Sequence, residues 1–266
     1  MDEKRFGEEI GRLPTMMDPS ADRDLPAFDR RRRARNGVRL LGGLDEAGRG
    51  ALAGPVVCAV VVLGPGTRLP GLDDSKQLTA ARRERLAPLI LERAADWALG
   101  QATAAEVDRV NVLEATRMAA GRALMGLACP PERLLTDCLE LADPPCPIEA
   151  IVDGDAQSQA IAAASVLAKV ARDRVMAALD AQYPAYGLAR HKGYGTRAHW
   201  AAIEAHGPST LHRLSYKGVC FFSNTPAVWA RDGRRAGPPP APDWSAVLGQ
   251  GDGLDGRLFL PEAEWA

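Results

Sequence analysis

Acidic side chains recur at the ends of short apolar runs in this sequence. Asp45 and Glu46 stand where one run closes, Asp137 closes a second, and Asp155 follows a third. Adjacent strand residues point to opposite faces, but at a strand end both side chains can reach one region. Active sites in open α/β sheets gather at strand ends, and Mg²⁺ prefers carboxylate oxygen and water as ligands. The four acids therefore predict a divalent-metal site suited to hydrolysis.

Each acid also has a structural interpretation. Taken alone, Asp45 and Glu46 followed by Gly48-Arg49-Gly50 are typical of a polar hairpin turn. In the catalytic interpretation, the glycines let backbone amides approach a ligand and Arg49 meets a phosphate. Asp155 stands at the start of a long helix, where capping of free amides is the alternative role.

A polar stripe follows Asp155 along the helix expected at 157–181. Its members recur at intervals of seven, four and three and share one face: Ser158, Ser165, Lys169 and Arg172. The stripe is placed to run from the metal site along a phosphate backbone. An ordinary solvated helix face has the same pattern.

The stretch 181–219 contains all four histidines and five cations against one carboxylate, Glu204, which indicates a local basic surface. The histidines, whose spacings of eight, seven and six do not match compact zinc pairs, are His191, His199, His206 and His212. We interpret them as phosphate or structural partners. The runs 183–187 and 191–195 interleave aromatic rings, glycines and cations, which suits sugar stacking with phosphate contact but equally a tyrosine-capped loop.

The elements that position these residues alternate between strand and helix patterns, which predicts an α/β domain with a mixed sheet. Apolar and β-branched runs predict strands at 39–45, 56–63, 97–103, 134–138 and 148–152. Segments rich in Ala, Leu, Arg and Glu predict helices at 79–93, 104–127 and 157–181.

Composition divides the chain into three parts. Residues 1–37 mix both charges and include the run Arg30–Arg33, which predicts a flexible N-terminal extension with no catalytic role. Residues 38–222 form the expected folded domain, and residues 223–266 read as a C-terminal extension rich in Pro and Gly. The alternative for the arginine run is contact with nucleic-acid phosphate.

The same composition excludes several classes of protein. No apolar run approaches the roughly 20 residues of a membrane span, and the start lacks the order of a signal peptide. Five cysteines without a CxxC pair indicate reduced thiols rather than disulfides or a zinc ribbon, so we expect a cytoplasmic protein. The net charge of −1 gives no whole-chain indication of a nucleic-acid partner.

Several segments, in this order along the chain, resemble the ribonuclease HII family. They are GLDEAGRGALAGPVV at 43–57, DDSKQL at 73–78, GDAQSQAIAAASVLAKVARDRVM at 154–176, YPAYGLARHKGYGT at 183–196 and HGPSTLHRLSY at 206–216. The resemblance covers about 38–220 and implies an RNase H-like fold, a mixed sheet flanked by helices with a helical C-terminal portion. It implies a hydrolase that cuts the RNA strand of RNA–DNA hybrids and nicks duplex DNA 5′ of embedded ribonucleotides. Such cuts leave 3′-hydroxyl and 5′-phosphate ends and serve ribonucleotide removal in DNA replication and repair.

The resemblance also implies two Mg²⁺ or Mn²⁺ ions, bound by Asp45, Glu46, Asp137 and Asp155. The ions would activate water and stabilise the departing oxygen. The family usually has Asp-Gly where this chain has Asp137-Cys138, so Asp143 and Asp153 are rivals for the third position. Backbone groups of Gly48, Arg49 and Gly50 would read the ribose 2′-hydroxyl, and Tyr194 would pack on the neighbouring deoxyribose.

Further candidates for phosphate contact are Ser75, Lys76, Ser165, Lys169, Lys192 and Arg213. The family's Asp-Ser-Lys motif supports Lys76, and position along the chain supports the others. A structural salt bridge is the alternative for each cation, particularly Lys169 with Asp173 one turn away. The expected partners are nucleic acids and not membranes, and nothing in the sequence demands more than a monomer.

Two rival functions share these features. A non-catalytic hybrid-binding protein would keep the fold without cutting, but the presence of all four acids argues against it. A metal nuclease acting on DNA junctions would share the carboxylates, yet it would not need Gly48-Arg49-Gly50 and Tyr194 as a sensor of the 2′-hydroxyl.

Overall fold

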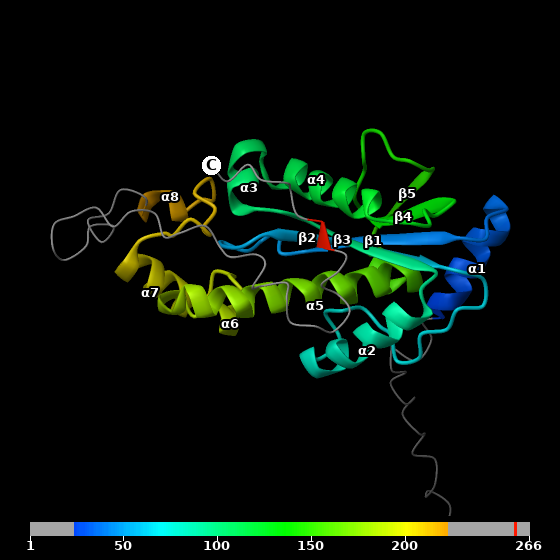
Figure 1. Cartoon of the computed structure of the whole chain (residues 1–266), viewed down its shortest axis with the longest axis horizontal. Helices are drawn as coiled ribbons and strands as arrows, with labels where there is room; N and C mark the ends of the chain where they lie inside the picture. The colour runs from blue at the N-terminus through cyan, green and yellow to red at the C-terminus, as the bar shows by residue number, and fades with distance from the viewer. Residues whose placement is uncertain (1–23, 223–257, 260–266) are drawn as a thin grey trace, which may run out of the picture.

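A six-stranded mixed sheet forms the centre of the computed structural model, which describes residues 24–222 and 258–259 (Figure 1). The strands are β1 (Leu41–Ala47), β2 (Val56–Leu63), β3 (Asp96–Ala102), β4 (Arg133–Asp137), β5 (Ile148–Ile151) and β6 (Leu258–Phe259). They lie in the order β5-β4-β1-β2-β3-β6. β1, β2 and β3 are antiparallel neighbours, whereas β4 joins β1, β5 joins β4 and β6 joins β3 in parallel. The predicted mixed sheet is confirmed.

Helices cover both faces of the sheet: α2 and α5 lie on one side and α3 and α4 on the other (Figure 1). Their bounds are α2 (Ala80–Arg93), α3 (Ala104–Val110), α4 (Val112–Met125) and α5 (Gln159–Gln182). The helical C-terminal portion is also confirmed, as η2 (Pro184–Tyr186), α6 (Leu188–His191), α7 (Arg197–His206) and α8 (Val219–Phe222). Within the described ranges, no helix combines the length and the apolar content that crossing a membrane requires.

Two helix boundaries differ from the prediction because side chains cap backbone amides there. The helix predicted over 104–127 is two helices, since Asn111 adopts a φ of 74° and its side chain accepts from the first amides of α4. The long helix begins after Ser158, whose hydroxyl accepts from Ile161 N, so Ser158 and not Asp155 is its N-cap. Asp155 lies in the short turn η1 (Gly154–Ala156) just before it.

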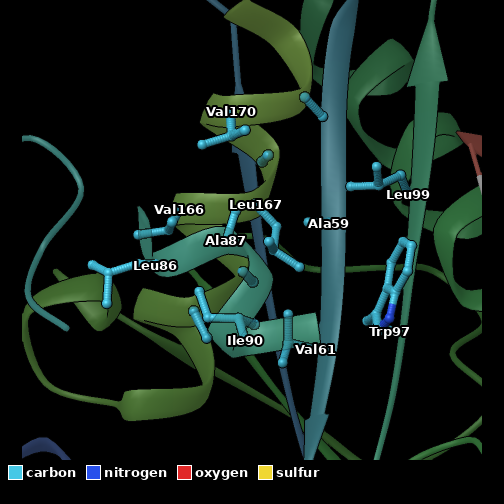
Figure 2. Close-up of a cluster of buried hydrophobic side chains, with 14 of the residues drawn as sticks. Ala59, Val61, Leu86, Ala87, Ile90, Trp97, Leu99, Val166, Leu167 and Val170 are labelled. Atoms are coloured by element: carbon cyan, nitrogen blue, oxygen red, sulfur yellow. The ribbon is translucent and has the colours of Figure 1, made fainter. Parts of the chain in front are cut away.

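The β2 run shows no alternation in sequence because both of its faces are buried. Ala59 and Val61 pack towards α5 and α2, where Figure 2 shows the larger part of the core. Cys58, Val60 and Val62 pack towards α4. The sheet is therefore a buried middle layer, and helices on both sides fix its strands.

α5 lies directly on β1 at Gly43. A Cβ added to Gly43 would stand 2.0 Å from the carbonyl carbon of Ala160, so only glycine permits this approach. The close contact sets the register between strand and helix. That register carries Ser165, one turn further along α5, over the acidic residues of β1.

The N-terminal extension differs from its prediction, because residues 25–36 form helix α1 (Leu25–Asn36) packed on the domain. Asp29 is fully buried, and its carboxylate accepts hydrogen bonds from Ser158 Oγ at 2.7 Å and Ala160 N at 3.0 Å. Burial raises the pKa of Asp29 to about 6. The predictions for residues 1–23, and for 223–266 apart from the two residues of β6, lie outside the described residues.

Candidate active site

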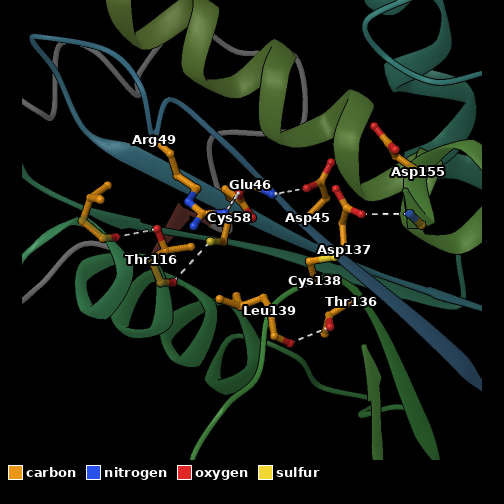
Figure 3. Close-up of polar contacts among 12 residues, drawn as sticks. Asp45, Glu46, Arg49, Cys58, Thr116, Thr136, Asp137, Cys138, Leu139 and Asp155 are labelled. Carbon is orange, nitrogen blue, oxygen red and sulfur yellow. Dashed lines mark hydrogen bonds and ion pairs between the residues drawn. The ribbon is translucent and has the colours of Figure 1, made fainter. Parts of the chain in front are cut away.

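The parallel pairing of β1 and β4 brings the predicted acids together. Leu44 pairs with Thr136, which places Asp45 beside Asp137, and Gly154 N donates to Asp137 Oδ1 at 2.8 Å. Figure 3 shows Asp45, Asp137 and Asp155 grouped near the start of α5, with Glu46 beside Arg49. β1 continues to Ala47, so the first two acids lie inside the strand and not at its end as predicted.

The acidic side chains of the site repel one another. Burial, followed by the charge of Glu46, raises the pKa of Asp45 well above its usual value, against hydrogen bonds from Ser165 and the Glu46 amide. Burial also raises the pKa of Glu46. The charge of Arg49 lowers this pKa, and the charge of Asp137 raises it further. Burial and the charge of Asp155 likewise raise the pKa of Asp137. A divalent cation would relieve this repulsion.

Protein cations balance two of the acids. Lys76 Nζ lies 3.0 Å from Asp155 Oδ2, and Arg49 lies 3.1 Å from Glu46 Oε1. The hydrogen bond to Asp155 raises the pKa of Lys76. Among residues 24–222, no three His, Cys, Asp or Glu side chains lie close enough together to hold a metal ion.

The donor set nevertheless fits a hard divalent cation. Its groups are carboxylates, which such ions prefer, and Glu46 Oε2 is buried without a hydrogen-bond partner among the described residues. Lys76 is a flexible cation with a side chain 72% exposed, so it can leave Asp155 without disturbing the fold. Movement of the Lys76 side chain would therefore free Asp155 to meet an ion.

Asp74 is a fifth acid at the site, which the sequence analysis did not select. Burial raises its pKa, and the charge of the neighbouring Asp155 raises it further. Asp74 Oδ1 also accepts from Lys76 N at 2.8 Å. The motif at 73–78 contained this residue, but it stands in a loop and follows no strand. Only the folded loop brings Asp74 to Asp155.

The three candidates for the third carboxylate have different surroundings, and the charge of Asp153 acts on Asp137. Asp143 lies in the loop between β4 and β5, where it lines a surface pocket against α4. Asp153 is exposed and adopts a φ of 50°. Cys138 also has a φ of 50°, in the left-handed region that favours glycine. This backbone conformation explains why the family resemblance implies glycine at position 138. The pairing of β1 with β4 keeps Asp137 beside Asp45.

Two buried arginines hold the loop between β1 and β2. Arg172 is fully buried and donates to Pro55 O at 2.9 Å, Ala53 O at 3.1 Å and Lys192 O at 2.9 Å. Burial lowers its pKa to about 10, so the guanidinium remains charged at neutral pH. Gly48 has a φ of 99°, and a Cβ there would stand 2.0 Å from Arg172 Nε, so this position requires glycine.

Arg213 has a structural role that differs from its predicted phosphate contact. It is fully buried and donates to Arg49 O at 2.8 Å and Gly54 O at 2.9 Å. Tyr216 OH also donates to Arg49 O. Since carbonyl oxygens take the donors of Arg213, this side chain positions the 48–55 loop and does not face a ligand.

The remaining candidates divide between supporting and exposed positions. Ser75 and Ser165 are buried and share a hydrogen bond of 2.7 Å, so they support Asp45. Lys169 pairs with Asp173 at 2.6 Å, which is the alternative role considered for it, and its Nζ lies 5.7 Å from the centre of the Tyr194 ring. Tyr194 is 37% exposed and Lys192 is half-buried. Of the stripe on α5, Ser158, Ser165 and Arg172 are buried, so the stripe is not a continuous surface.

Three histidines form a buried stack. The rings of His191 and His199 stack with centroids 4.3 Å apart, and His199 Nε2 lies 3.1 Å from His212 Nε2. His212 Nδ1 accepts from Ser209 N at 2.9 Å. Of the two roles considered for the histidines, phosphate contact and structural support, these three therefore have the structural one. They join α6 and α7 to the loop at 209–213.

We expect the imidazoles of His199 and His212 to remain uncharged at pH 5. Burial lowers the pKa of His199 to about 4 and that of His212 to about 3, from the ordinary 6.5. Because the unfolded chain then binds more protons, their contribution to stability is complete above about pH 6.5 and is lost as pH falls towards 4. Imidazole chemical shifts of His199 and His212 followed by NMR from pH 7 to 5 test this. Titration of either buried ring near pH 6 would contradict the expectation.

Comparisons with known proteins agree with this geometry. The sequence profile of the family Ribonuclease HII matches residues 42–219. A Ribonuclease HII of Syntrophotalea carbinolica is 52% identical over 194 residues, which cover 73% of this chain and 93% of that protein. A Ribonuclease HII of Nitrosococcus oceani is 51% identical over 180 residues, covering 68% of this chain and 90% of that protein.

Solved structures show the same fold. The ribonuclease H2 from Pyrococcus horikoshii superposes with a TM-score of 0.58 at 27% identity, covering 69% of this chain and 97% of that one. Bst-RNase HIII in complex with Mn²⁺ superposes with a TM-score of 0.54 at 21% identity, covering 69% of this chain and 68% of that one. The second likeness concerns the fold alone. The RNase H-like fold expected from the sequence is confirmed.

Proposed function

The chain belongs to the ribonuclease HII family of hydrolytic endonucleases that cut RNA in RNA–DNA hybrids, and from this premise we propose that it also nicks duplex DNA 5′ of a single embedded ribonucleotide. The observation that carries the proposal is the group of carboxylates beside a rigid glycine loop. Asp45 and Asp137 lie side by side on β1 and β4, and Arg172 and Arg213 hold the loop that contains Gly48 and Gly50.

We propose Asp45, Glu46, Asp137 and Asp155 as the residues that hold two Mg²⁺ or Mn²⁺ ions. The raised pKa values of Asp45, Glu46 and Asp137, the buried Glu46 Oε2 and the exposed Lys76 support this assignment. When bound, such ions activate a water molecule for in-line attack on the phosphodiester and stabilise the departing oxygen. The products of that reaction carry 3′-hydroxyl and 5′-phosphate ends.

The protein's own residues position the substrate. Backbone groups of Gly48, Arg49 and Gly50 would read the 2′-hydroxyl, the group by which a protein distinguishes RNA from DNA. Tyr194, exposed beside Lys169, offers a ring for the adjacent deoxyribose. Lys76, once displaced from Asp155, remains near the scissile phosphate as a point charge. Ser165 keeps Asp45 oriented by a hydrogen bond from α5.

We place this activity in ribonucleotide removal during DNA replication and repair, in the cytoplasm, with the protein acting as a monomer. The cysteines support this location, because all five are free thiols and thiols stay reduced in the cytoplasm. The basic residues of the 181–219 stretch support a nucleic-acid partner despite a net charge of −1.

One experiment tests the proposal against its rivals. The protein is incubated with Mg²⁺ or Mn²⁺ and a DNA duplex containing one ribonucleotide, beside an all-DNA duplex of the same sequence. We expect a nick 5′ of the ribonucleotide and none in the control. Cutting of both duplexes would indicate a DNA nuclease, cutting of neither a binding protein, and either result would overturn the proposal.

A further inference from the structure

A cavity lined by arginines lies between α1 and the turn that follows β2. Its volume is about 540 Å³. α1 and the segment 37–39 before β1 form one wall, the turn at 65–68 forms the other, and Gln159 of α5 completes the lining. Four guanidinium groups border it and no carboxylate does: Arg30, Arg33, Arg39 and Arg68. Nothing in the proposed cleavage reaction uses these side chains.

The fold presents this face of α1 to the cavity. Pro26, Arg30, Arg33 and Gly37 line it at intervals of four, three and four, which is one helical face. The other side of α1 is fastened to the domain, because Asp29 accepts hydrogen bonds from Ser158 and Ala160 at the start of α5 and Arg32 pairs with Glu149 at 2.9 Å. The arginines on the cavity side are therefore held at this place and are not part of a free tail.

Among the described residues, the cavity arginines bind no carboxylate directly. The charge of Asp29 acts on Arg33, whose guanidinium donates to Arg39 O at 3.1 Å and Leu63 O at 3.0 Å and so closes the wall of the cavity. Within the described residues, Arg30, Arg39 and Arg68 form no ion pair. Like charges gathered around one cavity repel, so an anion bound there would be stabilised.

The cavity and the carboxylate site share a loop. Residues 65–68 line the cavity, and Lys76 further along the same loop reaches Asp155. Gln159 fastens this loop to the first turn of α5, since its side chain accepts from Leu69 N at 3.2 Å and donates to Thr67 O at 3.1 Å. Gln159, which lines the cavity, also stands only four residues after Asp155, so the cavity and the carboxylate site both adjoin the start of α5.

We propose that this cavity is a second nucleic-acid contact, in which Arg30, Arg39 and Arg68 bind backbone phosphates of the duplex that flanks the cleavage site. The inference rests on the proposed function, because it assigns the flank of the same substrate. Arginine suits the role, since its planar guanidinium binds phosphate oxygens in pairs and stays charged. Phosphate contacts of this kind add affinity and register without reading sequence.

The test compares two variants with the same loss of charge. Arg30→Gln with Arg68→Gln removes two cavity cations, whereas Arg31→Gln with Arg35→Gln removes two exposed cations of α1 that do not line the cavity. Fluorescence anisotropy measures Kd for a 30-base-pair all-DNA duplex in EDTA at several salt concentrations. Circular dichroism checks that both variants fold.

We expect the cavity variant to bind the duplex at least about fivefold more weakly, and its plot of log Kd against log salt to lose a slope of about 2. The matched variant should stay within about twofold of the unaltered protein, since it leaves the cavity intact. Equal weakening of both variants would indicate diffuse attraction and would overturn the proposal. Unchanged binding by the cavity variant would overturn it too.

A further arm separates backbone phosphate from free phosphate compounds. Inorganic pyrophosphate and ATP are titrated against the unaltered protein, with the melting temperature as the readout. The nucleic-acid proposal would be overturned if micromolar pyrophosphate or ATP raised the melting temperature of the unaltered protein but not of the cavity variant, and if both bound the duplex equally well. That result would assign the cavity to a free anion. Cleavage of the ribonucleotide duplex by the unaltered protein tests the proposed function separately, so the two failures are distinguishable.

Discussion

Asp45→Asn is expected to reduce cleavage of a ribonucleotide-containing duplex by about 10³-fold or more and to raise the melting temperature of the metal-free protein. The first effect follows from the proposed role, because the substitution removes a charge that holds the divalent ions. The second follows from the repulsion among Asp45, Glu46 and Asp137, which an uncharged amide relieves. Asn Oδ1 can still accept from Glu46 N, so the local backbone is kept.

Cleavage rates under single-turnover conditions and thermal unfolding in EDTA measure the two effects, with about 2–4 °C expected for each kcal/mol gained. Asp143→Asn is the matched control, since Asp143 is exposed against α4 and should change neither quantity. Asp137→Asn should resemble Asp45→Asn. Activity within tenfold of the unaltered protein would rule Asp45 out as a ligand, and a loss confined to Asp153→Asn would move the third ligand to that position.

Gly43→Ala is expected to destabilise the fold by about 3 kcal/mol or more, the upper range for overpacking. The added methyl group would stand 2.0 Å from Ala160 C, 2.2 Å from its carbonyl oxygen and 2.3 Å from Ile161 N. These are backbone atoms of α5 and cannot rotate away. The helix must therefore move off β1, which also displaces Ser165 from Asp45.

Urea unfolding measures this change, and Gly121→Ala provides the matched control. Gly121 lies inside α4, where an added Cβ meets no atom within 4 Å, so alanine should stabilise that helix by about 0.5–1 kcal/mol. Equal stability of Gly43→Ala and the unaltered protein would contradict the contact between β1 and α5. Loss of cleavage without loss of stability would show that the methyl group acts only on the site.

Local signals predicted most of the strands and helices. The β-branched run 56–63 became β2 with the expected bounds, because a strand buried on both faces needs no alternation. The acids at the ends of the runs came together because β1, β4 and β5 are parallel neighbours. Asn111 escaped notice because the segments on both sides of it are rich in helix-forming residues, and only its positive φ divides α3 from α4.

Long-range hydrogen bonds account for what the sequence did not predict. Arg213 looked like a phosphate contact because its stretch is basic, but carbonyl groups more than a hundred residues away take its donors. Asp29 was missed for a similar reason, because its partners Ser158 and Ala160 lie more than a hundred residues away at the start of α5. The four arginines that follow it in the sequence suggested a solvated tail. Asp74 reached the site through a loop whose path no periodicity encodes.

The carbonyl-bound arginines also bear on the kinetics of recognition. Arg172 and Arg213 fix the loop at 48–55 through hydrogen bonds of the fold itself, so its conformational entropy is lost during folding and not on association. Under the proposed function, a sugar arriving at this loop would meet donors and acceptors that the fold already holds in place. Under the proposed function, ribose and deoxyribose would then differ mainly in how long they stay bound, and little in how fast they arrive.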